Sequence, residues 1–554
     1  MVMIRHRIAE LLEKAAVKAQ EKGLLPSVEL PEMTVERPQN PQHGDYAGTA
    51  ALKLARAARM NPLTIAENLA SLLEPIEEIE RITVVPPGFI NFSLKDDWLK
   101  RQVETILTAG EEFGNLDLGK GERVQVEYVS VNPTGPLHVG HGRGAVLGST
   151  LANILAAAGY SVQKEYYIND AGTQIEAFYR SVYARYLQAL GVEAEMPSEG
   201  YFGDYVNDLA REIIQEKGET YKGLPHDQAL QEIGRVGLEK MLNSIKSDLE
   251  RMRVEFDVWF SETSLYEEGQ YTRAIDILRK GDYIAEKEGA TWFVSTALGE
   301  DKDNVLVRSS GAPTYFASDV AYHYNKFLER GFDKVINIWG ADHQGHISRM
   351  KAVVGALDID PERLQVIISQ MVMLRRGEEV LKVSKRTGDI VTLGELLDEV
   401  GPDVTRFFFL GRSADSQMDF DLELAKKQSA DNPAYYVQYA HARISSILRL
   451  AQEKGIDYGE GDASLLSTDP ELTLIRQMLI LPELVESTAL TLEPQHLPYY
   501  AQELATLFHG FYEQCLVISD DEPLTRARLK LVRAAQIVLA KTLHLMGMSA
   551  PEQM

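Results

Sequence analysis

The feature that most constrains the fold is a strand, loop, helix and strand pattern in residues 123–168. Residues 123–131 are rich in β-branched side chains, as a strand would be, and they run into the Gly/Pro loop NPTGPL. A helical stretch over about 138–158 ends at Gly159, and residues 160–168 again have the composition of a strand. So short a succession predicts a βαβ unit, and therefore a parallel α/β sheet.

Two regions outside the predicted sheet have different patterns. Residues 1–115 combine helical periodicity with a hairpin pattern around a Pro-Pro-Gly turn, which predicts a separate α+β domain. Residues 421–554 show helical periodicity with few strand signals, which predicts an α-helical bundle. The parallel-sheet domain between them would occupy 121–420, with strands resuming at 334–340 and 364–369 after a mostly helical insertion at about 176–300.

Charge and cysteine content exclude several classes of function. The formal net charge is −25, mostly from residues 151–300 and 451–500, where charge runs of this kind usually form solvated helical faces. Because positive charge drives non-specific binding to nucleic acids, this acidity argues against a general nucleic-acid coat. The single cysteine, Cys515, excludes an intrachain disulfide and a thiolate zinc site and fits a reducing, cytoplasmic location. The amino terminus does not resemble a secretory signal, and no apolar stretch has the roughly 18 residues of a membrane span.

The strongest local motif is VNPTGPLHVGHGRGAV at residues 131–146. It places His138, Gly140, His141 and Gly144 at a helix N-terminus, where unpaired N–H groups and the helix dipole favour phosphate. The glycines allow a base or ribose to approach the backbone, and the histidines could donate hydrogen bonds to phosphate oxygens. The alternatives are a capped structural helix and a metal pair, and the metal pair is less favoured because no third ligand is near in the sequence.

A second motif is VLKVSKRTGDIVTL at residues 380–393. Lys382 and Lys385 flank Ser384 in a predicted loop, where lysines could neutralise a leaving pyrophosphate. Taken alone, the motif is better interpreted as a solvent-exposed basic loop. Its pairing with the first motif favours nucleotide chemistry.

The two motifs, HVGH at 138–141 and KVSKR at 382–386, resemble the HIGH and KMSKS motifs of class I aminoacyl-tRNA synthetases. Within that class, residues 126–175 closely resemble the bacterial arginyl-tRNA synthetases. The resemblance extends to HGDYAGTAALKLA and PGFINFSL near the N-terminus, to DNPAYYVQYAHARISSI in the predicted bundle, and to the C-terminal MGMSAPEQM. Val139 and Val383 are apolar departures from the motif pattern, and we expect them to have little effect.

The resemblance implies a Rossmann-like catalytic domain flanked by an N-terminal additional domain and an anticodon-binding helical bundle. It implies ATP-dependent activation of L-arginine to arginyl-adenylate, release of pyrophosphate, and transfer of arginine to the 3′ adenosine of tRNA(Arg). ATP would be used as a substrate with Mg²⁺, without a prosthetic group, a protein-held metal or a membrane partner. The family's usual state is a monomer.

The family's site residues can be matched to positions in this sequence. Catalysis would involve His138, His141, Lys382 and Lys385, with Gly140, Gly144 and Ser384 also in the ATP site. A guanidinium is planar and always charged, so its recognition requires carboxylates placed for fork-like hydrogen bonds. Asp319 is expected to make that contact, with Glu127 near the amino end of the substrate. The whole matched arginine-binding set is Glu127, Ser130, Asn132, Tyr315, Asp319 and His343.

The sequence is less informative about RNA contacts. Tyr435, Tyr439 and Arg443 could stack on unpaired bases, although half-buried core aromatics are an equally good interpretation. A modest basic stripe on one helical face and the C-terminal residue complete the candidates, which are Arg526, Lys530, Arg533 and Met554.

Two other functions compete with a synthetase. A catalytically silent paralogue could bind tRNA, but the retention of both motifs argues against silence. A different nucleotidyltransferase with an HxGH motif would not need the flanking RNA modules, and a cysteine-specific ligase would need a thiolate zinc site that one cysteine cannot make.

The second motif yields a direct test. In this family, members that lack the second lysine of the motif tend to carry a lysine before the first motif, where this chain has Gly135. Because Lys385 would therefore supply the charge, Lys385→Ala should slow adenylate formation more than it weakens arginine binding. The ATP–pyrophosphate exchange rate and the arginine KM measure the two effects, and an unchanged exchange rate would contradict the assignment.

Overall fold

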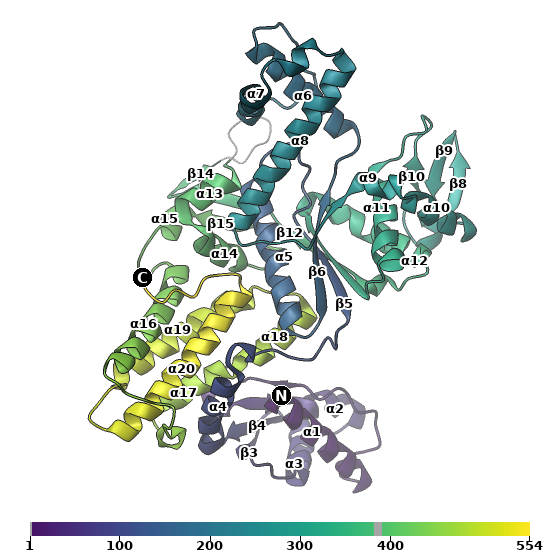
Figure 1. The fold of residues 1–554 in the computed structure, drawn as a ribbon. Helices are drawn as coiled ribbons and strands as arrows, with labels where there is room; N and C mark the ends of the chain where they lie inside the picture. The colour runs from purple at the N-terminus through teal and green to yellow at the C-terminus, as the bar shows by residue number, and fades with distance from the viewer. Residues whose placement is uncertain (1–2, 382–390) are drawn as a thin grey trace.

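A five-stranded parallel sheet forms the centre of the computed structural model, which describes residues 3–381 and 391–554 (Figure 1). Every neighbouring pair of strands in this sheet is parallel, in the order β12-β11-β5-β6-β7. The strands are β5 (Arg123–Glu127), β6 (Ser161–Ile168), β7 (Val258–Ser261), β11 (Lys334–Gly340) and β12 (Leu364–Ser369). The predicted parallel α/β sheet is confirmed.

The strand order reverses direction between β5 and β11. From β5 the chain passes through α5 (Val139–Ala157) to β6 on one side, and from β11 it passes through α12 (Ile347–Ala356) to β12 on the other. In open α/β sheets, ligands bind in the crevice outside the carboxyl ends of the strands at such a switch point. The topology therefore predicts a binding site among the residues that follow β5 and β11.

The predicted strand at 123–131 is too long. β5 ends at Glu127, because Val129 and Ser130 have positive φ angles of 69° and 45°, which no strand can contain. The helix that follows packs very closely on this segment, and a Cβ on Gly148 would lie 2.1 Å from the Tyr128 ring. Glycine at 148 thus lets α5 lie directly over the end of β5.

The region predicted as one mostly helical insertion contains a strand of the central sheet. Three helices leave the sheet after β6 and form the top of the molecule in Figure 1, and the chain then returns as β7 before it leaves again. β7 is only four residues long, which is why its pattern was not recognised. The remaining elements here are α6 (Thr173–Ala189), α7 (Asp204–Lys217), α8 (His226–Arg251), α9 (Glu262–Glu267), α10 (Gln270–Lys280) and an antiparallel sheet of β8 (Ile284–Lys287), β9 (Ala290–Phe293) and β10 (Asn304–Val307).

The N-terminal region is an antiparallel four-stranded sheet covered by helices. The predicted first helix and the predicted hairpin are both confirmed. Its strands are β1 (Val35–Glu36), β2 (Tyr46–Gly48), β3 (Ile79–Val85) and β4 (Phe89–Leu94), and its helices are α1 (Ile4–Glu21), α2 (Ala50–Ala58), α3 (Pro62–Leu72) and α4 (Asp96–Ala109).

The C-terminal region is the predicted α-helical bundle. Its long helices begin at polar N-caps followed by proline, as at Asn432 before α16 and Asp521 before α20. The bundle helices are α16 (Pro433–Glu453), α17 (Asp469–Met478), α18 (Ile480–Thr491), α19 (His496–Gln514) and α20 (Glu522–Leu545). Between sheet and bundle lie β13 (Val372–Arg376), β14 (Glu379–Leu381), α13 (Leu393–Val400), α14 (Pro402–Leu410), β15 (Met418–Asp421) and α15 (Leu422–Ala425).

Ion pairs join the N-terminal region to the bundle. Arg37 pairs with Glu483 at 2.9 Å, and Arg476 pairs with Asp45 at 2.8 Å. α4 packs against α17 and α20, so the N-terminal region and the helical bundle lie side by side in Figure 1. Within the described ranges, no helix is long and apolar enough to cross a membrane.

A buried arginine holds the bundle against the parallel-sheet domain. Arg406, on α14, is fully buried and donates to the carbonyl oxygens of Met546 at 2.6 Å and Met252 at 2.9 Å, and to the Ser149 hydroxyl at 2.8 Å. These acceptors belong to α5 and to the ends of α8 and α20. One side chain therefore connects four helices.

Replacement of this arginine should be strongly destabilising. Arg406→Met leaves several buried acceptors without a donor, and we expect a loss of about 3 kcal/mol in the free energy of unfolding. Urea denaturation measures it, with Arg412→Met, at an exposed position just after α14, as the control. Equal unfolding midpoints for the two variants would contradict the role given to Arg406.

Candidate functional site

The first sequence motif lies at the N-terminus of α5, next to the switch point of the sheet. His138 is the N-cap residue, and its backbone N–H donates to Nδ1 of His141 at 3.2 Å. The two imidazole rings stack with centroids 3.3 Å apart. The predicted pair of histidines on one helix N-terminus is therefore present, in a position suited to an anionic group.

The glycines of this motif have different roles. A Cβ on Gly144 would have no heavy atom within 4 Å, so this side of the helix is open, and at Gly140 the nearest group is the His138 ring at 3.1 Å. At Gly142, by contrast, a Cβ would lie 2.7 Å from Leu393. Gly142 thus serves close packing, and the expectation that it admits a base or ribose is wrong.

The end of the second motif lies against the first motif. Thr392 forms an antiparallel bridge with His138, and the Leu393 N–H donates to the Leu137 carbonyl at 2.8 Å. β14 ends at Leu381 on the other side. The predicted residues Lys382, Ser384 and Lys385 lie outside the described residues, and Thr392, which follows them in the sequence, is bonded to the start of α5.

Three carboxyl groups face one another beyond the ends of β5 and β6. Glu127 ends β5, Asp319 lies on α11 (Tyr315–Tyr324), and Glu262 begins α9. Burial raises the pKa of Asp319 to about 7, and the nearby Glu127 and Glu262 add to the rise. The pKa of Glu262 is also raised, chiefly by burial. Such a cluster is poised to receive a cation, which would relieve the repulsion among the carboxylates.

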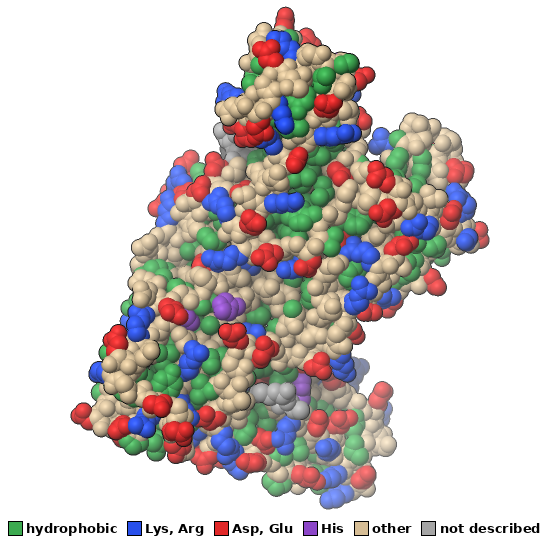
Figure 2. Space-filling model, in the orientation of Figure 1, with side chains coloured by type: hydrophobic (Ala, Val, Ile, Leu, Met, Phe, Trp, Pro, Cys, Tyr) green, Lys and Arg blue, Asp and Glu red, His purple; other side chains and the backbone are tan. Residues whose placement is uncertain are grey.

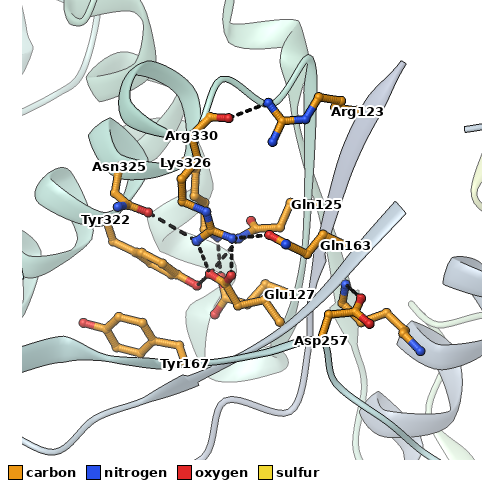
Figure 3. A network of polar contacts seen from close by, with 12 residues as sticks. Arg123, Gln125, Glu127, Gln163, Tyr167, Asp257, Tyr322, Asn325, Lys326 and Arg330 are labelled. Carbon is orange, nitrogen blue, oxygen red and sulfur yellow. Dashed lines mark hydrogen bonds and ion pairs between the residues drawn. The ribbon is translucent and has the colours of Figure 1, made fainter. Parts of the chain in front are cut away.

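Glu127 belongs to a polar row across the sheet. Asn337 on β11, Glu127 on β5 and Glu165 on β6 are in register, so their side chains lie on one face. Lys326 donates to Glu127, and Arg330 pairs with Glu165 (Figure 3). Lys326 lies in the π-helical turn η5 (Asn325–Glu329), which continues α11, and Arg330 directly follows this turn.

The other predicted arginine-site residues lie around the same carboxyl ends of strands. The Ser130 hydroxyl accepts from the Tyr167 N–H at 3.1 Å, and Asn132 contacts Gln174. Tyr315, at the start of α11, is 47 % exposed, and His343 lies in η6 (Ala341–His346), directly after β11, with an exposed side chain. The structure thus places all six predicted residues at the end of β5, on segments that follow β5 or β11, or on α11.

Several polar residues of this region were not predicted from the sequence. They are Glu165, Glu262, His323, Lys326 and Asn337, all of them buried. The available signal was a polar residue inside a strand pattern, as in KVINIWG and YSVQKEYYI. Such a residue in a fully covered strand must have a buried partner.

The predicted RNA-contacting residues fall into two groups. Tyr435 and Tyr439 are parallel, with ring centroids 6.2 Å apart, and the Arg443 guanidinium lies 4.8 Å from the Tyr439 ring centroid. Tyr439 and Met554 are exposed, as is Arg533 on α20.

The basic stripe on α20 is not a stripe on the surface. Lys530 is 8 % exposed and pairs with Glu104 of α4 at 2.5 Å. The prediction that Lys530 contacts RNA is therefore wrong. Arg526 pairs with Glu522 on its own helix at 2.5 Å. The sequence pattern did not reveal that this face of α20 packs against α4.

The surface has no extended field of one sign on the face drawn in Figure 2. Lys and Arg side chains lie next to Asp and Glu side chains over this face. Binding of a polyanion would therefore depend on local groups rather than on overall attraction.

Known proteins share these features over the whole chain. Residues 102–407 match the family model for the catalytic domain of class I (R) tRNA synthetases. Residues 3–94 match the arginyl-tRNA synthetase N-terminal domain, and residues 437–554 match the DALR anticodon-binding domain. An arginine–tRNA ligase of Dehalococcoides mccartyi is 57 % identical over 554 residues, which cover 100 % of both chains.

Solved structures have the same fold. A Campylobacter jejuni structure described as an arginyl-tRNA synthetase is 34 % identical, with a TM-score of 0.77, and covers 83 % of this chain and 100 % of its own. The Thermus thermophilus arginyl-tRNA synthetase superposes with a TM-score of 0.79 over 100 % of both chains at 23 % identity. The expected multidomain α/β fold is confirmed.

Proposed function

Because the chain belongs to the arginyl-tRNA synthetase family, we propose that the carboxyl cluster at the switch point is its arginine pocket. The chain is an arginine–tRNA ligase: it activates L-arginine with ATP to arginyl-adenylate and pyrophosphate, and it transfers arginine to the 3′ adenosine of tRNA(Arg). The observation that carries the proposed location is the cluster of Asp319, Glu127 and Glu262, in which Glu127 ends β5, the strand whose following loop leads to the nucleotide-type motif of α5.

Asp319 receives the guanidinium in this proposal. It is partly buried at the end of the sheet, and its pKa is raised first by burial and then by the nearby Glu127 and Glu262. A guanidinium would supply a positive charge and donate two parallel hydrogen bonds to the carboxylate. A ligand without a fixed charge at this position would leave the carboxylates uncompensated, which disfavours its binding.

The remaining predicted residues complete the arginine pocket. Glu127, already paired with Lys326, is assigned to the amino end of the substrate. Exposed Tyr315 and His343 would close the outer side, and Ser130 and Asn132 lie on the loop that leads to the first histidine.

ATP is assigned to the N-terminus of α5. His138 and His141 would donate to phosphate oxygens, and the open side of Gly144 leaves space near the helix for the nucleotide. The segment with Lys382, Ser384 and Lys385 would complete the site, since its flanking residue Thr392 is bonded to His138.

Mg²⁺ is assigned to ATP as part of the substrate complex. The side-chain donors at the α5 N-terminus are imidazoles, whereas Mg²⁺ prefers oxygen ligands and is usually held through substrate phosphates. The protein residues then bind and orient the phosphates.

tRNA is assigned to the bundle and to the regions that flank the sheet. Tyr435, Tyr439 and Arg443 form an aromatic and cationic surface suited to unpaired bases, with Arg526, Arg533 and Met554 as further candidates. The proposed domains are residues 1–115, 121–420 and 421–554, and the second of them contains an insertion at about 176–300. A monomeric, cytoplasmic enzyme without a membrane partner is part of the proposal, supported by the family's usual state and the single cysteine.

Arginine-dependent ATP–pyrophosphate exchange tests the proposal. We expect exchange with arginine in the presence of tRNA(Arg), and little without the tRNA, as is usual in the family. Asp319→Asn should raise the arginine KM by about tenfold or more, because a charged hydrogen-bond partner is lost, while the ATP KM stays within about twofold. Full exchange with another amino acid, or an unchanged arginine KM in the variant, would refute the pocket assignment.

The titration of Asp319 predicts a pH dependence. Its pKa of about 7 lies above the ordinary 3.8, so the carboxyl is mostly protonated at pH 6 and mostly ionised at pH 8. Glu127 and Glu262 favour the protonated form, whereas Arg349 and Lys326 oppose it. Since the guanidinium binds the carboxylate, the arginine KM should fall roughly tenfold from pH 6 to pH 8. Asp319→Asn should abolish this slope, and an equal slope in the variant would contradict its origin in Asp319.

A further inference from the structure

A chain of buried hydrogen bonds connects the two sides of the proposed arginine pocket. Lys326 Nζ donates to the Glu127 carboxylate at 2.5 Å and to the side-chain amide oxygen of Asn337, Oδ1, at 2.9 Å. The Asn337 amide nitrogen lies 3.0 Å from His323 Nε2, and His323 Nδ1 lies 2.8 Å from the Asp319 backbone oxygen. The three connecting side chains are at most 2 % exposed.

The donor and the acceptor of each hydrogen bond in this series are fixed by their chemistry. A backbone carbonyl can only accept, so Nδ1 of His323 must carry a proton and donate to Asp319. Burial, together with the neighbouring Lys326, lowers the pKa of His323 to about 3, so the ring is neutral and Nε2 is an acceptor. Asn337 therefore donates its amide hydrogen to His323 and offers its oxygen to Lys326.

The backbone reinforces the same connection. Asn337 is directly opposite Glu127 in the sheet register, and the π-helical turn η5 begins one residue before Lys326. Lys326 also lies 4.1 Å from the centroid of the Tyr322 ring, which packs beneath it on α11 (Figure 3). π-helical turns occur frequently at functional sites, where they redirect side chains.

We propose that Lys326, Asn337 and His323 form a positioning relay that fixes the distance between Glu127 and Asp319, and with it the length of the cationic amino acid accepted. The relay touches neither end of the substrate directly. It rests on the assignment of Asp319 and Glu127 to the two ends of arginine. A pocket whose ends are fixed should discriminate against a homologue longer by one methylene, because its cation and its amino group could not both reach their carboxylates.

Asn337→Leu is the primary test. It removes both central hydrogen bonds while both carboxylates and the Lys326–Glu127 pair are retained. In exchange assays with tRNA, we expect the arginine KM to rise by about tenfold, with the ATP KM within about twofold. The preference for L-arginine over L-homoarginine, as a ratio of kcat/KM values, should fall by a similar factor.

Asn325→Leu is the matched control. Asn325 is another buried asparagine, in η5 next to Lys326, and it is bonded to Gln270 and Arg330 but lies outside the relay. It should lower Tm while leaving the arginine KM and the homoarginine preference within about twofold. Equal effects of the two variants, or no change in Asn337→Leu, would overturn the relay.

Two further variants separate the possible outcomes. If Asn337→Leu does not yield folded enzyme, Lys326→Arg keeps the cation but alters its geometry and should give the same loss of homoarginine discrimination; unaltered discrimination would overturn the relay. If Asp319→Asn also leaves the arginine KM unchanged, the pocket assignment has failed. If Asp319→Asn raises it and both relay variants resemble the wild type, the relay alone has failed.

Discussion

The centre of the molecule depends on neutralising two carboxylates that are buried side by side in the sheet. Glu127 and Glu165 are at most 7 % exposed and in register on neighbouring strands, so each needs a cation of its own. Lys326 and Arg330 supply these charges from a single π-helical turn. Because α11 continues into that turn, the charge pairing also fixes the helix that carries Asp319. The interaction that makes the sheet stable is thus the one that holds the pocket in shape.

Regular periodicity predicted individual helices from the sequence, whereas contacts between segments far apart in the chain could not be predicted. α5 and its histidine N-cap follow from a Gly/Pro loop before a long apolar helix, and the bundle follows from sustained helical periodicity. β7 was missed because four residues give no period, and Lys530 was misassigned because a helical face does not reveal its neighbour. Lys326 and Asn337 become meaningful only when the register of β5 and β11 is known. The resemblance supplied most residues of the proposed pocket, but the sequence could not show which buried groups support them.

Two buried arginines extend this dependence beyond the sheet. Arg143, near the start of α5, donates to the carbonyl oxygens of Gln370, Ser413 and Ser416, which flank β13 and β15. Arg406 holds the same helix further along, at Ser149, and also bonds to the end of α20. Both guanidiniums are bound by neutral oxygens, and burial lowers the pKa of each to about 10, so both stay charged at neutral pH. The position of the helix with the nucleotide motif is therefore set jointly by the segments before β13 and β15 and by the end of the bundle helix α20.

Part of the acidic composition lies inside the protein rather than on its surface. The charge run at 451–500 suggested a solvated face, but three of its carboxylates are buried against arginines, namely Glu471, Glu483 and Glu486 with Arg528, Arg37 and Arg5. These pairs hold the bundle together and join it to the N-terminal region, so that part of the negative charge is neutralised inside the protein. A protein of net charge −25 then binds a polyanion through local groups, such as Arg443 beside Tyr439, rather than through overall attraction. Selectivity for one tRNA is a natural consequence, because general attraction contributes so little.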